Sequence, residues 1–226
     1  MTDFVPANGS NMILITQTIS HSAVSEKRRN NLVNEMRPYD IPMVFVHGQL
    51  KTDVATIKYM LTANTRKCLE TFKKTTYQYG FLCDDDFHPH PDFLVELNKT
   101  LELLPKNWRC LHLCPGYLWG RMYRRCKVAG KLDPEYNIDG LECHESGRFF
   151  INCHKYPLLH GWLGGPIAVV VNRDHIDTFI EEFNWECFYD VQSNDVMLKR
   201  MMKDQDFICR SPLLGYENEQ GGTTLW

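Results

Sequence analysis

The sequence lacks the features of a membrane-spanning or secreted protein. No apolar run approaches the roughly 20 residues that a helix needs to cross a bilayer. Residues 1–11 are polar and lack the charged-then-apolar layout of a signal peptide. An internal repeat and a low-complexity tract are also missing. These absences predict a soluble protein that stays in the cytoplasm.

The sequence also lacks an excess of basic residues. It has 25 Lys and Arg against 28 Asp and Glu, for a formal net charge of -3. Nucleic-acid-binding domains usually carry a strong basic excess, whereas the basic cluster at residues 121–125 is only local. The charge balance therefore argues against a general nucleic-acid binder.

The nine cysteines lack the pattern of a disulfide framework. Their number is odd, and most lie inside apolar segments, where cysteine behaves as a small hydrophobic residue. Because no secretory signal is present, we expect reduced thiols. The cysteines in apolar segments are Cys68, Cys83, Cys110, Cys187 and Cys209.

The length and the apolar content predict one folded domain over residues 1–226. The chain is 43% hydrophobic and 23% charged, as is usual for a globular protein. Alternating strand and helix patterns predict an α/β fold with a mainly parallel central sheet flanked by helices. We expect strands at 12–16, 43–46, 79–83, 108–113, 167–171 and 207–210, and helices at 22–36, 53–75, 90–104, 174–183 and 195–202.

Two segments interrupt this alternation. Residues 115–159 are rich in Gly, Tyr, Arg and Cys and hold no lasting period, so we expect an irregular insertion that shapes a binding lobe. Residues 215–226 are polar and contain glycine, and we expect them to wrap around the domain or fray. The end of the chain supplies no obvious stop, so the sequence is compatible with the first domain of a longer protein.

Three consecutive aspartates, Asp84, Asp85 and Asp86, follow the apolar strand that ends at Cys83. Carboxylates repel one another and suit neither a strand nor a core, but ligands bind at the carboxyl ends of strands in open α/β sheets. Carboxylate oxygens also suit Mg²⁺ or Mn²⁺. The alternative is an acidic surface turn that favours the positive end of the next helix.

The segment Phe81-Leu82-Cys83-Asp84-Asp85-Asp86 resembles the strand and D-x-D motif of glycosyltransferases with the GT-A fold. Within that family, the length and motif order are similar to those of the glycosyltransferase domain of large algal (chlorella) viruses. The resemblance implies a Rossmann-like domain that requires Mn²⁺ or Mg²⁺, with Asp86 and Asp84 as metal ligands. It implies that Asp84 and Asp85 also contact the donor.

Two further segments resemble donor-binding elements of the family. Thr16, Gln17 and Thr18 end the first predicted strand, where the family receives the nucleotide base. Asn64 and Arg66 lie about 20 residues before the acidic triplet, and an arginine there can grip a diphosphate with two hydrogen bonds. The alternative for Arg66 is an exposed charge on a helix.

On the acceptor side, His160-Gly161-Trp162-Leu163-Gly164-Gly165 resembles the glycine-rich turn near the acceptor. Gly164 and Gly165 allow the backbone to approach a sugar, and Trp162 offers it an apolar face; the alternative for Trp162 is a core position.

A carboxylate at the start of a late helix resembles the family's general base. Asp195 would take the proton from the acceptor hydroxyl, with Asp190 as the reserve candidate. The alternative for Asp195 is a helix N-cap, a position that Asp favours. The chain departs from the family in one respect. Many members take a further metal ligand, often His, from the C-terminal segment, and no histidine follows His175.

The resemblance implies an inverting glycosyltransferase that moves a hexose or deoxyhexose, such as glucose or rhamnose, from a UDP-sugar to a glycan hydroxyl. Residues 10–114 would form the nucleotide-sugar-binding half, and residues 115–226 the acceptor-side half and tail. A viral member would act in the host cytoplasm.

Two other functions remain open from the residues alone. A metal-dependent phosphoesterase or nucleotidyltransferase would use the same aspartates. A zinc-stabilised binding module would use ligands among Cys110, His112 and Cys114, with Cys143-His144 and Cys153-His154, although their spacings are not those of common structural zinc sites.

Overall fold

The structure is a computed structural model that describes residues 4–19, 22–48, 54–113, 142–143, 149–152, 168–182, 205–211 and 214–217. Its α-helices are α1 (Ala23–Met36), α2 (Val54–Lys73), α3 (Phe93–Leu103) and α5 (Ile176–Glu182), and its 3-10 helices are η1 (Arg37–Tyr39) and η4 (Arg173–His175). The strands are β1 (Met12–Ile19), β2 (Met43–Gly48), β3 (Tyr79–Asp84), β4 (Phe87–Pro89), β5 (Cys110–His112), β6 (Glu142–Cys143), β7 (Phe149–Asn152), β8 (Ala168–Asn172), β9 (Asp206–Ser211) and β10 (Gly215–Glu217).

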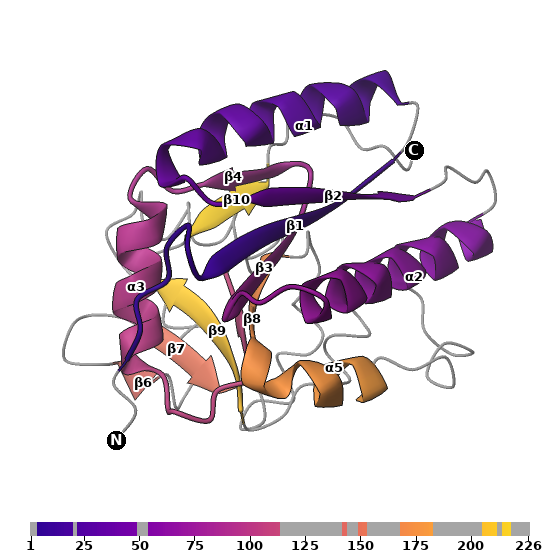
Figure 1. Cartoon of the computed structure of the whole chain (residues 1–226). Helices are drawn as coiled ribbons and strands as arrows, with labels where there is room; N and C mark the ends of the chain where they lie inside the picture. The colour runs from indigo at the N-terminus through magenta and orange to yellow at the C-terminus, as the bar shows by residue number, and fades with distance from the viewer. Residues whose placement is uncertain are drawn as a thin grey trace, which may run out of the picture.

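A central sheet of eight strands runs in the order β2-β1-β3-β8-β5-β9-β7-β6 (Figure 1). β1 pairs in parallel with β2 and β3, and β5 pairs in parallel with β9. β8 lies between β3 and β5 and is antiparallel to both. Only β8 and β7 of this sheet therefore run against the other strands. The predicted α/β fold is confirmed, with a sheet that is mainly parallel in strand direction but mixed in its pairings.

Helices cover both faces of the sheet (Figure 1). On one face, Leu32 of α1 and Phe93 of α3 belong to the cluster that packs on Leu14 and Phe81. On the other face, Phe72 of α2 and Phe179 of α5 belong to a second cluster. Successive side chains of β3 point to opposite faces of the sheet, so that Phe81 belongs to the first cluster and Leu82 to the second. Because both faces of this strand are buried, the residues on both faces are apolar.

Helix α1 begins where the sequence predicts it, but α3 begins later. Ser22 is the N-cap of α1, and its side chain accepts a hydrogen bond from the Ser25 backbone N–H. The prediction that His90 and Pro91 start the third helix is wrong, because these residues form a turn. The backbone N–H of Phe93 donates to the carbonyl of His90, and α3 begins at Phe93 with Asp92 as its N-cap.

Strands also occur where the sequence shows no regular period. The tail from residue 215 is expected to wrap around the domain or fray, and its residues Gly215–Glu217 form a regular strand, β10. This strand pairs antiparallel with β4, directly after the acidic triplet, so that Glu217 is the register partner of Phe87. Within the predicted irregular insertion, β6 and β7 extend the main sheet beside β9. The rest of that insertion and the helix predicted at 195–202 lie outside the described residues.

The buried cysteines agree with the sequence-based expectation. Cys68, Cys83 and Cys110 are buried free thiols. Burial is also the main cause that raises the pKa of Cys68 and Cys83 above the ordinary thiol range. Within the described part of the chain, no helix combines the length and apolar composition needed to span a bilayer.

Candidate metal and donor site

The acidic triplet lies at the carboxyl edge of the sheet, beside the end of β1. Gln17 on β1 is the register partner of Asp84 on β3, and the Gln17 side-chain amide donates to Asp84 Oδ1. Because parallel neighbours end at the same edge of a sheet, two segments more than sixty residues apart meet here. The end of the first strand, where the sequence predicts donor-binding residues, thus lies beside the triplet.

Asp85 is the buried anchor of the triplet. It is 6% exposed, and the Thr18 hydroxyl donates to its Oδ2 at 2.7 Å. Burial raises the pKa of Asp85, an effect that the Thr18 hydrogen bond opposes, while the charge of Asp86 raises the pKa and Arg28 and Arg29 lower it. The bonds of Asp85 are to protein groups, which indicates that this middle carboxylate holds the turn in place.

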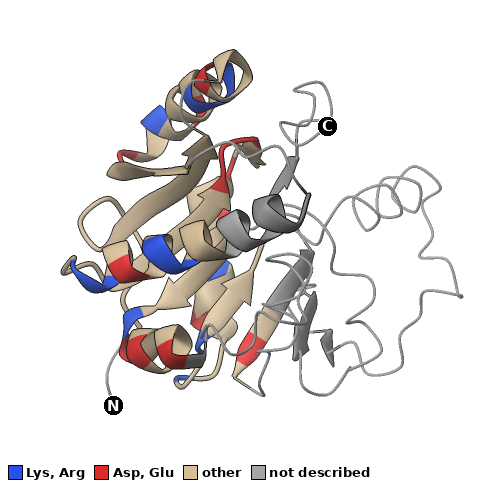
Figure 2. Cartoon of the chain, turned by 90° about the vertical axis from the view of Figure 1, so that its right-hand side faces the viewer, with Lys and Arg blue, Asp and Glu red and all other residues tan. Residues whose placement is uncertain are grey.

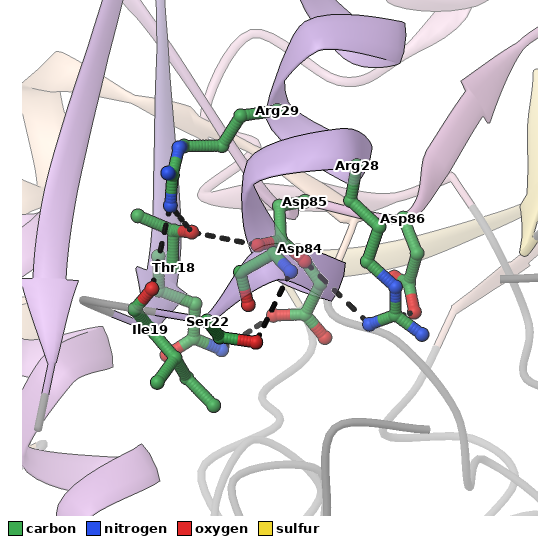
Figure 3. Close-up of polar contacts among 10 residues, drawn as sticks. Thr18, Ile19, Ser22, Arg28, Arg29, Asp84, Asp85 and Asp86 are labelled. Atoms are coloured by element: carbon green, nitrogen blue, oxygen red, sulfur yellow. Dashed lines mark hydrogen bonds and ion pairs between the residues drawn. The ribbon is translucent and has the colours of Figure 1, made fainter. Parts of the chain in front are cut away.

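Arg28 of α1 pairs with two of the three aspartates. Its Nη1 lies 3.1 Å from Asp86 Oδ2 and 3.6 Å from Asp85 Oδ1. Figure 3 shows the Arg28 side chain reaching from α1 to the triplet. The side chains of all three residues are no more than 10% exposed, so water screens these charges weakly.

Arg29 ties the same helix to the end of β1. Its Nη1 donates to Thr18 Oγ1 at 2.9 Å and to the carbonyl of Ile19 at 3.3 Å (Figure 3). Since Thr18 in turn donates to Asp85, a continuous chain of hydrogen bonds runs from α1 through β1 to the triplet. The two arginines therefore fix the three elements relative to one another.

Sequence reasoning missed both arginines, although one signal was available. The buried positions of α1 are Ser25, Arg28, Leu32 and Met36, spaced by three or four residues. This spacing marks one face of a helix, and an arginine in an otherwise inward-facing row requires a buried partner. Arg28 could thus have been assigned to an internal carboxylate, although not to a particular one.

Two buried oxygen atoms at this edge have no hydrogen-bond partner among the described residues: Asp86 Oδ1 and Gln17 Oε1. Both residues are 9% exposed. A carboxylate oxygen withdrawn from water without a donor is costly unless something binds it. Such a carboxylate oxygen is a suitable ligand for a cation.

A divalent cation of the Mg²⁺ or Mn²⁺ type suits this geometry. Such ions are commonly held by one or two carboxylates, with water and substrate phosphates completing the coordination. Within the described residues, no group of three or more His, Cys, Asp or Glu side chains is placed to hold a metal. The described residues therefore supply fewer than three such ligands at any one point, and they form no zinc cluster around Cys110 and His112.

The other predicted donor-side residues have three different environments in the structure. Thr16 is fully buried, with its hydroxyl 3.4 Å from Cys83 Sγ, so it faces the core rather than the edge. Asn64 of α2 is buried against Gly48, the last residue of β2. A Cβ at Gly48 would lie 2.0 Å from Asn64 Nδ2. Arg66 forms an ion pair with Glu70 on the same helix at 3.0 Å.

The remaining predicted site residues cannot be assigned a structural environment. Asp190, Asp195, Trp162, Gly164 and Gly165 lie outside the described residues. Basic and acidic residues are interspersed along the described helices (Figure 2).

Comparisons with known proteins identify the fold and leave the family open. No protein-family model matches the sequence, and no curated protein matches it. A solved structure titled "Crystal structure of a glycosyltransferase involved in the glycosylation of the major capsid of PBCV-1" is similar, with a TM-score of 0.52. The alignment covers 95% of this chain and 94% of that chain, at 8% sequence identity. The chain thus has the fold of a known glycosyltransferase over nearly its whole length.

Proposed function

We propose that this chain is a glycosyltransferase that uses a UDP-sugar and a divalent cation, Mn²⁺ or Mg²⁺. The observation that carries the proposal is the acidic triplet at the carboxyl edge, in which Asp85 and Asp86 are buried and Asp86 Oδ1 has no described hydrogen-bond partner. The fold shared with a glycosyltransferase supports the same assignment. A surface turn, the alternative from sequence, would leave the triplet exposed, whereas Asp85 and Asp86 are 6% and 9% exposed.

Within this proposal the three aspartates have separate roles. Asp86 and Asp84 hold the cation, which when bound neutralises the charge that develops on the departing diphosphate. Asp85 keeps both neighbours in position through its bonds to Thr18 and Arg28. Two observations support this division: Asp85 is bound by Thr18 and Arg28, whereas Asp86 Oδ1 has no described hydrogen-bond partner.

The donor would bind along the ends of β1 and β2. Gln17 has a buried oxygen without a described partner that can accept a hydrogen bond from the nucleoside. Asn64 has a similar unpartnered oxygen. Arg66 would bind the diphosphate in exchange for its pair with Glu70, which is partly exposed and of a kind that is weak. The buried Thr16 would support the strand and make no direct contact.

For the acceptor half we retain the sequence-based assignments as proposals. Asp195 acts as general base on a glycan hydroxyl, with Asp190 in reserve, and the sugar inverts its configuration. Trp162, Gly164 and Gly165 shape the acceptor surface. A hexose or deoxyhexose is the transferred sugar.

Calorimetry of UDP with Mn²⁺ tests the metal assignment. We expect Asp86→Ala to lose the Mn²⁺-dependent part of UDP affinity while the protein stays folded. Asp92→Ala is the matched control, because Asp92 is an exposed aspartate without a side-chain capping bond. Undiminished Mn²⁺-responsive UDP binding in Asp86→Ala would reject the role of Asp86.

A thermal-shift screen of nucleotide sugars, with and without Mn²⁺, tests the reaction class and the donor. We expect UDP-sugars to raise the melting temperature more with Mn²⁺ than without it. The best donor is then incubated with glycan acceptors. Hydrolysis of the donor to UMP and the sugar 1-phosphate, without sugar transfer, would instead favour the phosphoesterase alternative.

A further inference from the structure

Arg28 is bound to the same aspartate that would hold the proposed cation. Its Nη1 is 3.1 Å from Asp86 Oδ2, on the same carboxylate whose Oδ1 has no described partner. A cation at Oδ1 and the guanidinium at Oδ2 would share one carboxylate. Two positive groups at that separation repel each other, and burial strengthens the repulsion.

The local charge balance points the same way. Asp84, Asp85 and Asp86 carry three negative charges when ionised, and Arg28 and Arg29 carry two positive charges. The net charge of these five side chains is therefore one negative charge. A buried site with this charge is unfavourable when it is empty, and a divalent cation alone does not neutralise it. A divalent cation would leave one positive charge in excess, and this excess favours a ligand that brings phosphate groups with it.

We propose that Arg28 is a positioning residue that weakens binding of the cation alone and makes it dependent on a diphosphate. This inference rests on the proposed function and deepens it, because it assigns the order of assembly at the same site. Arg28 holds Asp85 and Asp86 in place before ligands arrive. The diphosphate then offsets the repulsion between the guanidinium and the cation, so that both fit around Asp86.

The first test is calorimetric titration of the full chain with Mn²⁺ alone. We expect Arg28→Gln to bind Mn²⁺ about tenfold more tightly than the wild type, because a positive charge next to the ion is removed. Arg29→Gln removes a charge whose hydrogen bonds are to Thr18 and the Ile19 carbonyl, so it should strengthen Mn²⁺ binding by less than Arg28→Gln. Lys27→Gln, at an exposed position of the same helix, is the matched control for net charge and should stay within about twofold of the wild type.

The second test measures how strongly UDP and Mn²⁺ assist each other. In the wild type, UDP should strengthen Mn²⁺ binding by a larger factor than in Arg28→Gln, and the reverse titration must give the same ratio. A residue that merely supported the fold would weaken both ligands and leave this factor unchanged.

A charge-preserving variant covers the case in which Arg28→Gln does not fold. Arg28→Lys keeps a positive charge on a shorter side chain, which moves that charge away from Asp86. Its Mn²⁺ affinity should rise, but by less than in Arg28→Gln. Circular dichroism of each variant verifies that it is folded.

The outcomes separate this inference from the proposed function. Mn²⁺ affinity that is unchanged or lower in both Arg28 variants, while Asp86→Ala abolishes Mn²⁺-dependent UDP binding, overturns the role of Arg28 and leaves the metal site standing. No Mn²⁺ binding in any variant overturns both. Tighter Mn²⁺ binding in Arg28→Gln without any effect of UDP supports the repulsion but overturns its dependence on a diphosphate.

Discussion

Two buried arginine–aspartate pairs lie in different parts of this molecule, and they differ in whether every carboxylate oxygen is bound. We call the pair in which both oxygens are bound complete, and the other incomplete. Arg109, just before β5, donates through Nε to Asp206 Oδ1 at 2.8 Å and through Nη2 to Asp206 Oδ2. Both side chains are 1% exposed, and the guanidinium packs 4.9 Å from the ring centre of Phe179. Arg28, in contrast, shares its charge between two aspartates and leaves Asp86 Oδ1 without a described partner.

This difference distinguishes an ion pair that only stabilises the fold from one that can still bind a ligand. In the Arg109–Asp206 pair both carboxylate oxygens are bound, so that it can only hold β5 and β9 together. The Arg28 cluster has longer ion-pair distances and an unused oxygen, at the sheet edge where α/β folds bind ligands. Buried charges are tolerated when they are fully paired, and the incomplete pair is therefore the one that indicates a ligand.

The largest effect should come from breaking the complete pair. Asp206→Ala leaves the Arg109 charge buried and uncompensated, so the free energy of unfolding should fall by about 3–5 kcal/mol. Urea denaturation measures the change. Asp177→Ala is the control, because its pair with Lys73 is exposed and should contribute nothing measurable. Equal stability of Asp206→Ala and the wild type would contradict the structural role.

A pH series tests the environment of the complete pair through its neighbour His112. Burial lowers the pKa of His112 from 6.5 to about 4, with Asp206 opposing this and Arg109 adding to it. A folded state that resists protonation is most stable above pH 6.5, so the wild type should lose stability as the pH falls from 6.5 to about 4. His112→Gln should lose less over that range, with His47→Gln, at an exposed position, as control. Parallel pH curves for His112→Gln and the wild type would argue against this.

Removing the Thr18 hydroxyl should loosen the incomplete cluster. Thr18→Val keeps the shape of the side chain but leaves Asp85 Oδ2 without its 2.7 Å donor. We expect a loss of about 1–3 kcal/mol in the free energy of unfolding. Thr18→Ser should restore most of this loss, because it returns the hydroxyl. If serine failed to restore it, packing rather than hydrogen bonding would be responsible.

The smallest effect on stability is expected at Asp86. Asp86→Asn keeps an oxygen that Arg28 can bind and removes repulsion with Asp85, so the free energy of unfolding should change by about 1 kcal/mol or less. Urea denaturation alongside Asp206→Ala sharpens the comparison between the two pairs. A loss as large as that of Asp206→Ala would mean that the Arg28 cluster is also structural.

The sequence by itself determined the α/β class and the position of the triplet after a strand. Apolar runs predict β1, β3 and β8, because a strand buried on both faces is largely apolar, and a shorter apolar run predicts the half-buried edge strand β2. The end of β3 and the acidic residues after it are adjacent in the chain, so local pattern is sufficient there.

Only the tertiary structure decided which charges meet at that edge. Arg28 and Asp86 lie far apart in the chain but form an ion pair. In the same way, β8 lies far along the chain from β3 and β5, with which it pairs. Local periodicity reports which face of a helix is buried but not what it is buried against. The pairing of Arg28 with Asp85 and Asp86, the anchoring of Asp85 by Thr18, and the addition of β10 to β4 all depend on how the layers pack, because each contact joins residues far apart in the chain.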